Sequence, residues 1–95
     1  MAGIVVVGSS NTDMIVKAAR IPRPGETILG GEFFTAPGGK GANQAVAAAR
    51  AGGEVTFVAR LGDDMFGERA YDGFAREGID VRHVTKDPAA ASGVA

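Results

Sequence analysis

Hydrophobic and polar positions along the chain alternate between short β-type runs and longer helical stretches. The continuous β-branched residues of Gly3–Gly8 are typical of a parallel strand that is covered on both faces. Glu54–Leu61 has the same character, and Ile79–Thr85 predicts a shorter strand. Helices are predicted over Ala42–Ala51, which lacks Gly and Pro, and over Met65–Glu77, which carries aromatic residues at helical spacing. Strands that alternate with helices in this way indicate an α/β fold with a parallel sheet.

Between the first predicted strand and the first helix, the pattern indicates a small β excursion. Asp13–Ala18 and Thr27–Ala36 read as extended stretches, the second broken at its two central glycines. The intervening Ile21–Glu26 contains two prolines and a glycine, which suit a turn and neither a helix nor a central strand. Phe33 and Phe34 are adjacent, so in a strand they face opposite ways.

Turn-forming residues predict where the helices begin and end. Gly52 follows the first helix and Gly78 the second, as expected for helix termination, and Asp63 or Asp64 can cap the second helix. The aromatic face of that helix is expected to be plain core. A loop is predicted over Lys86–Ser92, and Gly93–Ala95 reads as the beginning of a strand left without neighbours.

Composition narrows the class of protein. The chain has 95 residues, which is enough for one small domain. Its formal charge of −1 does not show the excess of positive charge that is typical of nucleic-acid-binding proteins. It contains no cysteine and one histidine, which argues against disulfides, thiolate zinc sites and His-rich metal sites. The apolar run Ile4–Val7 is too short for a signal peptide or a membrane span. A soluble, cytoplasmic protein without membrane or nucleic-acid partners is expected.

The most informative stretch is Ala36–Ala51, in which three glycines and a lysine lead directly into the first predicted helix. Free N–H groups and the positive end of the helix dipole are expected at this point. Lys40 and Asn43 would then face a ligand rich in hydroxyls or anionic oxygens. The alternative is a purely structural tight turn. The spacing fits neither a P-loop nor a dinucleotide fingerprint, since Lys40 is followed by glycine and Gln44 occupies the third glycine position.

Asn11 and Asp13 follow the carboxyl end of the first predicted strand. Ligands of open α/β sheets bind at such ends, so both side chains are candidate binding groups. The alternative is a local turn in which the two side chains bond the neighbouring backbone.

Together these motifs resemble the N-terminal part of the ribokinase-like members of the PfkB-type carbohydrate kinase family. The resemblance covers nearly the whole chain, in the family's order. It rests most specifically on GGKGANQAVAAAR, and also on Gly8-Ser9-x-Asn11-x-Asp13, Pro24-Gly25-Glu26-Thr27 and Leu61-Gly62-x-Asp64-x-Phe66-Gly67. It implies the first part of a three-layer α/β/α fold, residues 1–95, with a small β lid whose strands span about 13–18 and 27–36.

The resemblance also implies an activity. Kinases of this type transfer the γ-phosphoryl of ATP to a sugar hydroxyl, here the 5-hydroxyl of D-ribose, with Mg²⁺ and in some cases a monovalent cation such as K⁺. By position, the sugar-binding residues would be Asn11, Asp13, Gly39, Lys40 and Asn43. The family's lid also clasps the lid of a second subunit, so a homodimer through the lid strands is expected. A monomer whose lid folds back on itself is the alternative.

One departure from the family pattern concerns catalysis. The family's Gly-Ala-Gly-Asp turn, which holds the catalytic base, does not occur in the sequence. No catalytic, ATP-binding or metal-binding residue is therefore expected here, and the chain alone is expected to be an inactive, truncated part of a kinase. The alternatives are a small α/β protein that binds a sugar or a partner without catalysis, and a related kinase for fructose or a nucleoside.

Overall fold

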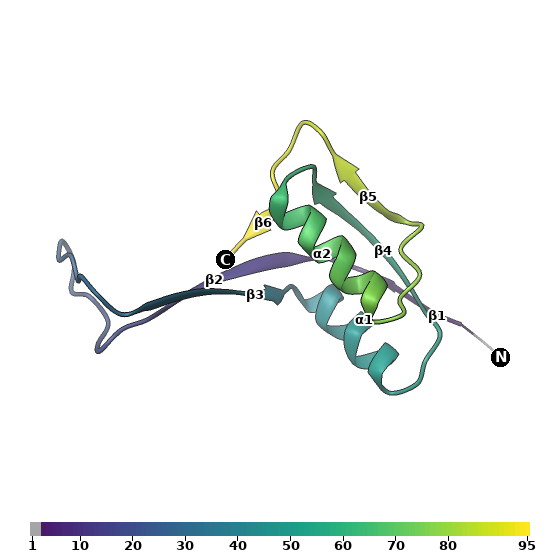
Figure 1. Cartoon of the computed structure of the whole chain (residues 1–95), viewed down its shortest axis with the longest axis horizontal. Helices are drawn as coiled ribbons and strands as arrows, with labels where there is room; N and C mark the ends of the chain where they lie inside the picture. Colours follow the sequence, from purple (N-terminus) through teal and green to yellow (C-terminus); the bar gives the residue numbers. More distant parts are fainter. Residues whose placement is uncertain (1–2) are drawn as a thin grey trace.

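The computed structural model describes residues 3–95, which fold into two sheets and two helices (Figure 1). The elements are β1 (Ile4–Val7), β2 (Asn11–Lys17), β3 (Glu32–Gly38), α1 (Lys40–Arg50), β4 (Val55–Gly62), α2 (Met65–Arg76), β5 (Val84–Asp87) and β6 (Gly93–Val94). The first sheet is parallel and has the strand order β1-β4-β5. The second has the order β3-β2-β6, in which β2 is antiparallel to β3 and parallel to β6. The predicted α/β fold with a parallel sheet is confirmed.

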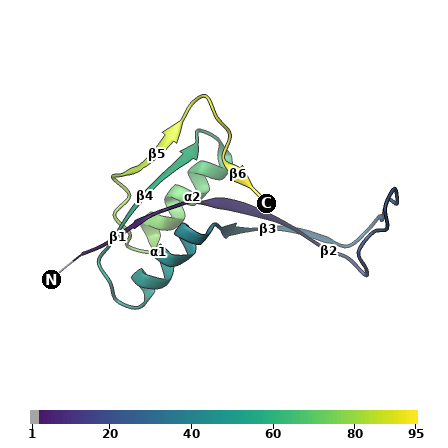
Figure 2. The same ribbon diagram turned by 180° about the vertical axis from the view of Figure 1, so that it is seen from behind.

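Both helices lie on the same side of the parallel sheet, as the two opposite views show (Figures 1 and 2). Phe57 on β4 is fully buried, and its ring meets that of Phe74 on α2 edge-to-face at a centroid distance of 5.1 Å. Aromatic pairs favour this geometry. The rest of the buried core consists of Ala42, Ala45, Val55, Leu61, Ile79 and Val84. Within residues 3–95, neither helix has the length and apolar character that crossing a bilayer requires.

The expectation that the first strand is covered on both faces is wrong for this chain. Val6 packs against the core, but Val5 and Val7 are 64% and 75% exposed. Side chains of neighbouring strand residues point to opposite faces. Both helices lie on one side of the sheet, and Val6 packs against the core there, which leaves the face of Val5 and Val7 uncovered. In the described part of the chain β1 is also an edge strand, with β4 as its single neighbour in the sheet.

The observed helices begin and end close to their predicted positions, whereas the last strand of the parallel sheet differs from its predicted position. Helix α2 is capped by Asp64, and α1 begins at Lys40, two residues before the predicted start at Ala42. The strand predicted over Ile79–Thr85 is interrupted, because Asp80 forms only an isolated parallel bridge with Thr56 of β4 and the regular strand β5 begins at Val84. The Asp80 carboxylate accepts a hydrogen bond from the backbone N–H of Arg82 at 3.0 Å, which favours a turn over an extended chain.

Strands β2 and β3 form a ribbon that projects away from the body of the molecule (Figure 1). This ribbon with its connecting loop, residues 11–38, is called the lid below. Both strands are displaced from their predicted positions, since β2 begins at Asn11 and β3 spans Glu32–Gly38. Gly30 and Gly31 have φ of 89° and 98°, a conformation outside the β region, so β3 begins only after them.

The short strand β6 pairs with β2 at the root of the lid. The predicted strand at Gly93 is confirmed, but the expectation that it lacks neighbours is wrong, because Gly93 and Val94 pair with Asn11 and Thr12 of β2. Figure 2 shows β6 beside the middle of the molecule, where β2 leaves the body. The second sheet therefore has three strands at the root of the lid.

Candidate functional site

The root of the lid meets the N-terminus of α1 at the carboxyl end of β1. The N–H of Gly8 donates to the carbonyl of Val58 at 3.2 Å, which extends the contact of β1 with β4. The carbonyl of the next residue, Ser9, accepts a hydrogen bond from the N–H of Ala42 at 3.0 Å. The loop that follows β1 is thus attached to the first turn of α1, at the sheet edge where ligands of α/β proteins bind.

Gly38, the last residue of β3, and Gly39, the N-cap of α1, allow this close approach. Gly39 has φ 96°, and a Cβ there would lie 2.7 Å from the carbonyl oxygen of Ser9 and 2.9 Å from the Cα of Ser10. A Cβ on Gly38 would collide with the carboxylate of Asp13. A side chain at Gly39 would therefore push the loop after β1 away from the start of α1, whereas a side chain at Gly38 would displace the Asp13 carboxylate.

Asn11 and Asp13 both belong to β2, so the alternative that they form a local turn is wrong. They are two residues apart and consequently share one face of the strand. Asn11 pairs with Gly38 across the ribbon, and the Asp13 carboxylate packs over the same glycine. Both side chains are partly exposed, which leaves them accessible to a ligand.

Lys40 and Asn43 lie in the first turn of α1, and both are exposed. The N–H of Asn43 donates to the carbonyl of Gly39 at 2.9 Å, so the helix begins directly at the glycine pair. Within residues 3–95, no side chain caps α1, and its first turn holds no acidic residue. The positive end of the helix dipole is therefore available to oxygen atoms of a ligand. The five residues expected from the sequence, Asn11, Asp13, Gly39, Lys40 and Asn43, thus gather around the junction of β3 and α1.

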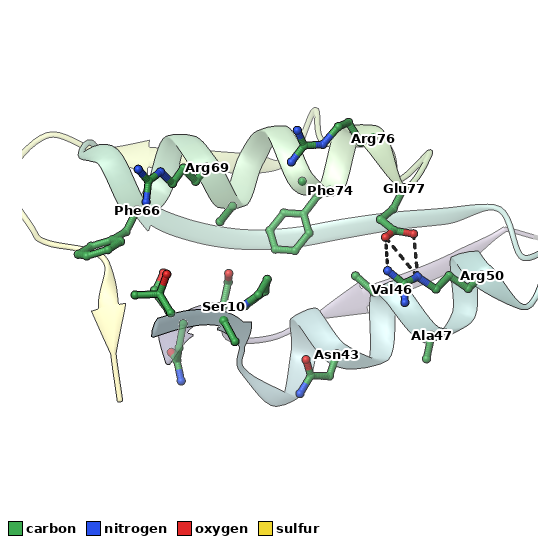
Figure 3. Close-up of a pocket in the computed structure, with 17 residues that line it drawn as sticks. Ser10, Asn43, Val46, Ala47, Arg50, Phe66, Arg69, Phe74, Arg76 and Glu77 are labelled. Carbon is green, nitrogen blue, oxygen red and sulfur yellow. Dashed lines mark hydrogen bonds and ion pairs between the residues drawn. The ribbon is translucent and has the colours of Figure 1, made fainter. Parts of the chain in front are cut away.

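A hollow of about 780 Å³ opens beside this junction, between the lid root, α1 and α2 (Figure 3). Asn11 and Asn43 line it, whereas Asp13, Gly39 and Lys40 are not among the described residues that do. Its α2 side is formed by residues of this helix and by its C-cap Glu77, namely Phe66, Arg69, Ala70, Gly73, Phe74, Arg76 and Glu77. The expectation that the whole aromatic face of α2 is core is therefore only half right, because Phe74 is buried but Phe66 is half-buried and borders the hollow.

An ion pair bridges the two helices at the far end of the hollow (Figure 3). The guanidinium of Arg50 on α1 donates to both carboxylate oxygens of Glu77, at 3.2 Å and 3.0 Å through Nε and at 2.5 Å through Nη2. The Arg50 hydrogen bonds lower the pKa of Glu77. Exposed ion pairs contribute little to stability, so this one links the ends of the two helices without adding much to the stability of the fold.

Within residues 3–95, the His, Cys, Asp and Glu side chains form no group of three or more that could hold a metal ion. The polar groups at the junction are amides, a carboxylate and an ammonium, which suit hydroxyl groups of a ligand better than a cation.

Two residues at the site were missed by the sequence interpretation. Ser92 hydrogen-bonds Asp64, the cap of α2, and Gly93 lies directly beside Asn11. Asp64 and Ser92 are 28 residues apart, so no local spacing could have indicated their contact.

Comparison with known proteins identifies the family. The family model described as pfkB family carbohydrate kinase matches residues 1–95. The chain belongs to this family. It is similar to the ribokinase of Bacillus subtilis (strain 168), with 47% identity over 79 residues, which are 83% of this chain and 27% of that protein. It is also similar to the deoxyribokinase of Salmonella typhi, with 40% identity over 92 residues, 97% of this chain and 30% of that protein.

Solved structures of PfkB kinases give the same result. The structure of Arabidopsis thaliana ribokinase complexed with ribose and ATP superimposes with a TM-score of 0.86 at 36% identity, and the match covers 97% of this chain and 30% of that one. The resemblance inferred from the motifs is therefore confirmed. The chain spans less than a third of the length of each of these three relatives.

Proposed function

We propose that the chain is the N-terminal, sugar-binding part of an ATP-dependent kinase that phosphorylates the 5-hydroxyl of D-ribose. The observation that carries this proposal is the junction of β3 and α1, where polar side chains of β2 meet an uncapped helix N-terminus. Ribokinases are among the relatives with the highest identity, and one of the similar structures was determined with ribose and ATP.

Each residue at the junction has a chemical role in this proposal. The carboxylate of Asp13 accepts hydrogen bonds from two sugar hydroxyls, and such charge-assisted bonds are stronger than neutral ones. The amides of Asn11 and Asn43 can both donate and accept, and the ammonium of Lys40 donates. Gly39 lets the sugar approach the backbone closely. A sugar that lacks one of these hydroxyls would leave a polar group unpaired, which is the basis of specificity.

Phosphoryl transfer needs further groups. It requires a base or orienting group for the nucleophile, and cations or donors that stabilise the charge on the transferred group. No residue of this chain is assigned to these tasks, so ATP, Mg²⁺ and a monovalent cation such as K⁺ belong to the proposal for the whole kinase. These ions, like a cytoplasmic location, stay predictions.

The proposal includes a homodimer formed through the lid. Val16 and Phe33 are cross-strand neighbours on one face of the ribbon and are 64% and 66% exposed, with Met14 next to them. An exposed apolar face on a projecting ribbon is suited to a second copy of the same surface. Strand β6 and Ala95 bond β2 only as far as Met14, so residues 15–17 of that edge have no strand partner within the described part of the chain.

The sugar site can be tested by titrating the ¹⁵N-labelled chain with D-ribose and following its amide signals. Saturable shifts confined to residues 38–43 and 11–13 are expected, and Asn43→Ala should abolish them. Gln44→Ala is the matched control, since it removes an exposed amide from the next position of the same helix. Stronger binding of 2-deoxy-D-ribose or D-fructose than of D-ribose would reassign the substrate. Absence of saturable shifts with all three sugars would refute the site.

A further inference from the structure

The cap of α2 is linked to the loop that precedes β6. One carboxylate oxygen of Asp64 accepts hydrogen bonds from the N–H of Gly67 at 2.8 Å and from the hydroxyl of Ser92 at 2.7 Å. Its other oxygen accepts from the N–H of Ser92 at 2.8 Å. The Ser92 hydroxyl oxygen in turn accepts from the N–H of Gly62 at 3.0 Å. These four bonds join the end of β4, the first turn of α2 and the last connecting loop.

Ser92 occupies a slot between two glycines. A Cβ on Gly67 would collide with the carbonyl oxygen of Gly62 and lie 3.0 Å from the Ser92 hydroxyl oxygen. A Cβ on Gly62 would lie 2.6 Å from the carbonyl carbon of Ala91 and 2.7 Å from Asp64 Oδ2. Neither glycine has a positive φ, so the backbone conformation does not require glycine at these two positions. Glycine is required because the neighbouring atoms leave no room for a side chain.

The residues after Ser92 lie directly on the proposed sugar site. Gly93 pairs with Asn11, and a Cβ on Gly93 would lie 2.9 Å from the side-chain oxygen of Asn11. The N–H of Ala95 donates to the carbonyl of Thr12 at 3.1 Å, and the N–H of Met14 donates to the carbonyl of Ala95 at 2.7 Å. The path from the cap of α2 to Asn11 is therefore continuous and short.

Burial does not hold β6 in this position. The strand has two residues, both exposed, and Val94 is 53% exposed. The preceding residues 88–91 are exposed as well. A two-residue strand with so little buried surface is marginal by itself, so its place depends on polar bonds. Capping of α2 alone would need only the bond from Gly67; the bonds to Ser92 require another explanation.

We propose that Asp64 and Ser92 are positioning residues, which hold β6 against β2 and thereby fix the side chain of Asn11 for sugar binding. The part of this inference that concerns sugar rests on the proposed function. Asp64 supplies a charged acceptor for both the N–H and the hydroxyl of Ser92, and bonds of this kind are stronger than neutral ones. Loss of the Ser92 hydroxyl alone would loosen β6 while leaving the cap bond to Gly67 in place.

The test is amide hydrogen exchange on the chain, with Ser92→Ala as the variant and Ser92→Thr as the conservative rescue. In Ser92→Ala, exchange of the Met14 N–H should accelerate by about tenfold, while the buried Phe57 N–H on β4 changes much less. Ser92→Thr should restore the wild-type rate. Thr85→Ala is the matched control, because it removes a hydroxyl that bonds Arg60 at 3.3 Å on the far side of the sheet. It should leave the Met14 rate unchanged.

A second measurement separates this inference from the proposed function. The D-ribose dissociation constant should rise about fivefold or more in Ser92→Ala and recover in Ser92→Thr. An unchanged Met14 rate, or equal acceleration at Met14 and Phe57, would show that Asp64 only caps α2. Faster Met14 exchange with unchanged ribose affinity would disprove the link to Asn11. If the wild-type chain binds no ribose, the proposed function fails. The exchange rate of Met14 and the side-chain amide signals of Asn11 would then still decide whether Ser92 holds β6 against β2.

Discussion

Gly41 in the first turn of α1 lies directly against Gly8 at the end of β1. A Cβ on Gly41 would lie 2.7 Å from the Cα of Gly8, and a Cβ on Gly8 would lie 2.8 Å from the Cα of Gly41. Real side chains do not tolerate such distances, so the two backbones touch only because both residues are glycine. This contact brings the loop after β1 to the helix N-terminus and places the start of β2 beside it.

Gly41→Ala should therefore lower the free energy of unfolding by about 1–3 kcal/mol, because the added methyl group forces α1 away from β1. Gly73→Ala on α2 is the matched control. A Cβ at Gly73 has no neighbour within 4 Å, so this change should stabilise the chain by about 0.5–1 kcal/mol through helix propensity. Urea unfolding followed by circular dichroism measures both. Equal effects of the two substitutions would contradict the close contact.

Asp13→Ala should weaken D-ribose binding by about 2–3 kcal/mol, since it removes a charged acceptor from the sugar site. The measurement is isothermal titration calorimetry or the amide titration described above. Lys17→Ala, at the other end of β2, serves as the control and should bind ribose like the wild-type chain. Unchanged affinity in Asp13→Ala would exclude Asp13 from the site.

The chain of 95 residues by itself should form no ADP from ATP in the presence of D-ribose, because none of its residues is assigned to phosphoryl transfer. A chimera of Bacillus subtilis ribokinase, in which this chain replaces the matching segment, should phosphorylate ribose. Asp13→Ala in the same chimera should remove most of that activity. Ribose-dependent ADP formation by the isolated chain would overturn the first expectation. A folded but inactive chimera would favour a sugar-binding or partner-binding protein without catalysis.

Phe33→Lys should dissociate the proposed lid dimer, because a charge in the centre of an apolar contact is expensive to bury. Light scattering at micromolar concentration should show a dimer for the wild-type chain and a monomer near 9.6 kDa for the variant. Met65→Lys, which changes an exposed apolar residue of α2 outside the lid, should leave the dimer intact. A monodisperse wild-type monomer would reject the dimer.

Stability should decrease as the pH falls from about 4 towards 2. The side-chain hydrogen bond from Arg82 lowers the pKa of Asp80 from its ordinary 3.8 to about 2, and backbone bonds from Ser92 and Gly67 lower that of Asp64. In this window the unfolded chain binds more protons than the folded chain, so acid favours unfolding. Asp80→Asn should flatten the pH dependence of the unfolding midpoint, and a wild-type slope in that variant would contradict the role of this carboxylate.

The sequence by itself determined the features that depend on neighbouring residues. The α/β order, helix α2 with its cap at Asp64, the helix-ending Gly52 and Gly78, and the family motifs were all predicted correctly. Capping, glycine conformation and β-branched runs act over a few residues, so they can be predicted without knowledge of the fold. The five candidate site residues also came from the sequence, and the structure brings them together around one junction.

Only the tertiary structure decided the features that depend on contacts distant in sequence. Val5 and Val7 are exposed because both helices pack on the opposite face of the sheet, which a β-branched run cannot indicate. Asn11 belongs to a strand because Gly38 and Gly93 pair with it from either side. Ser92 holds β6 through a residue 28 positions earlier. Such pairings form only when the folded chain brings distant segments together, so no local pattern in the sequence could specify them.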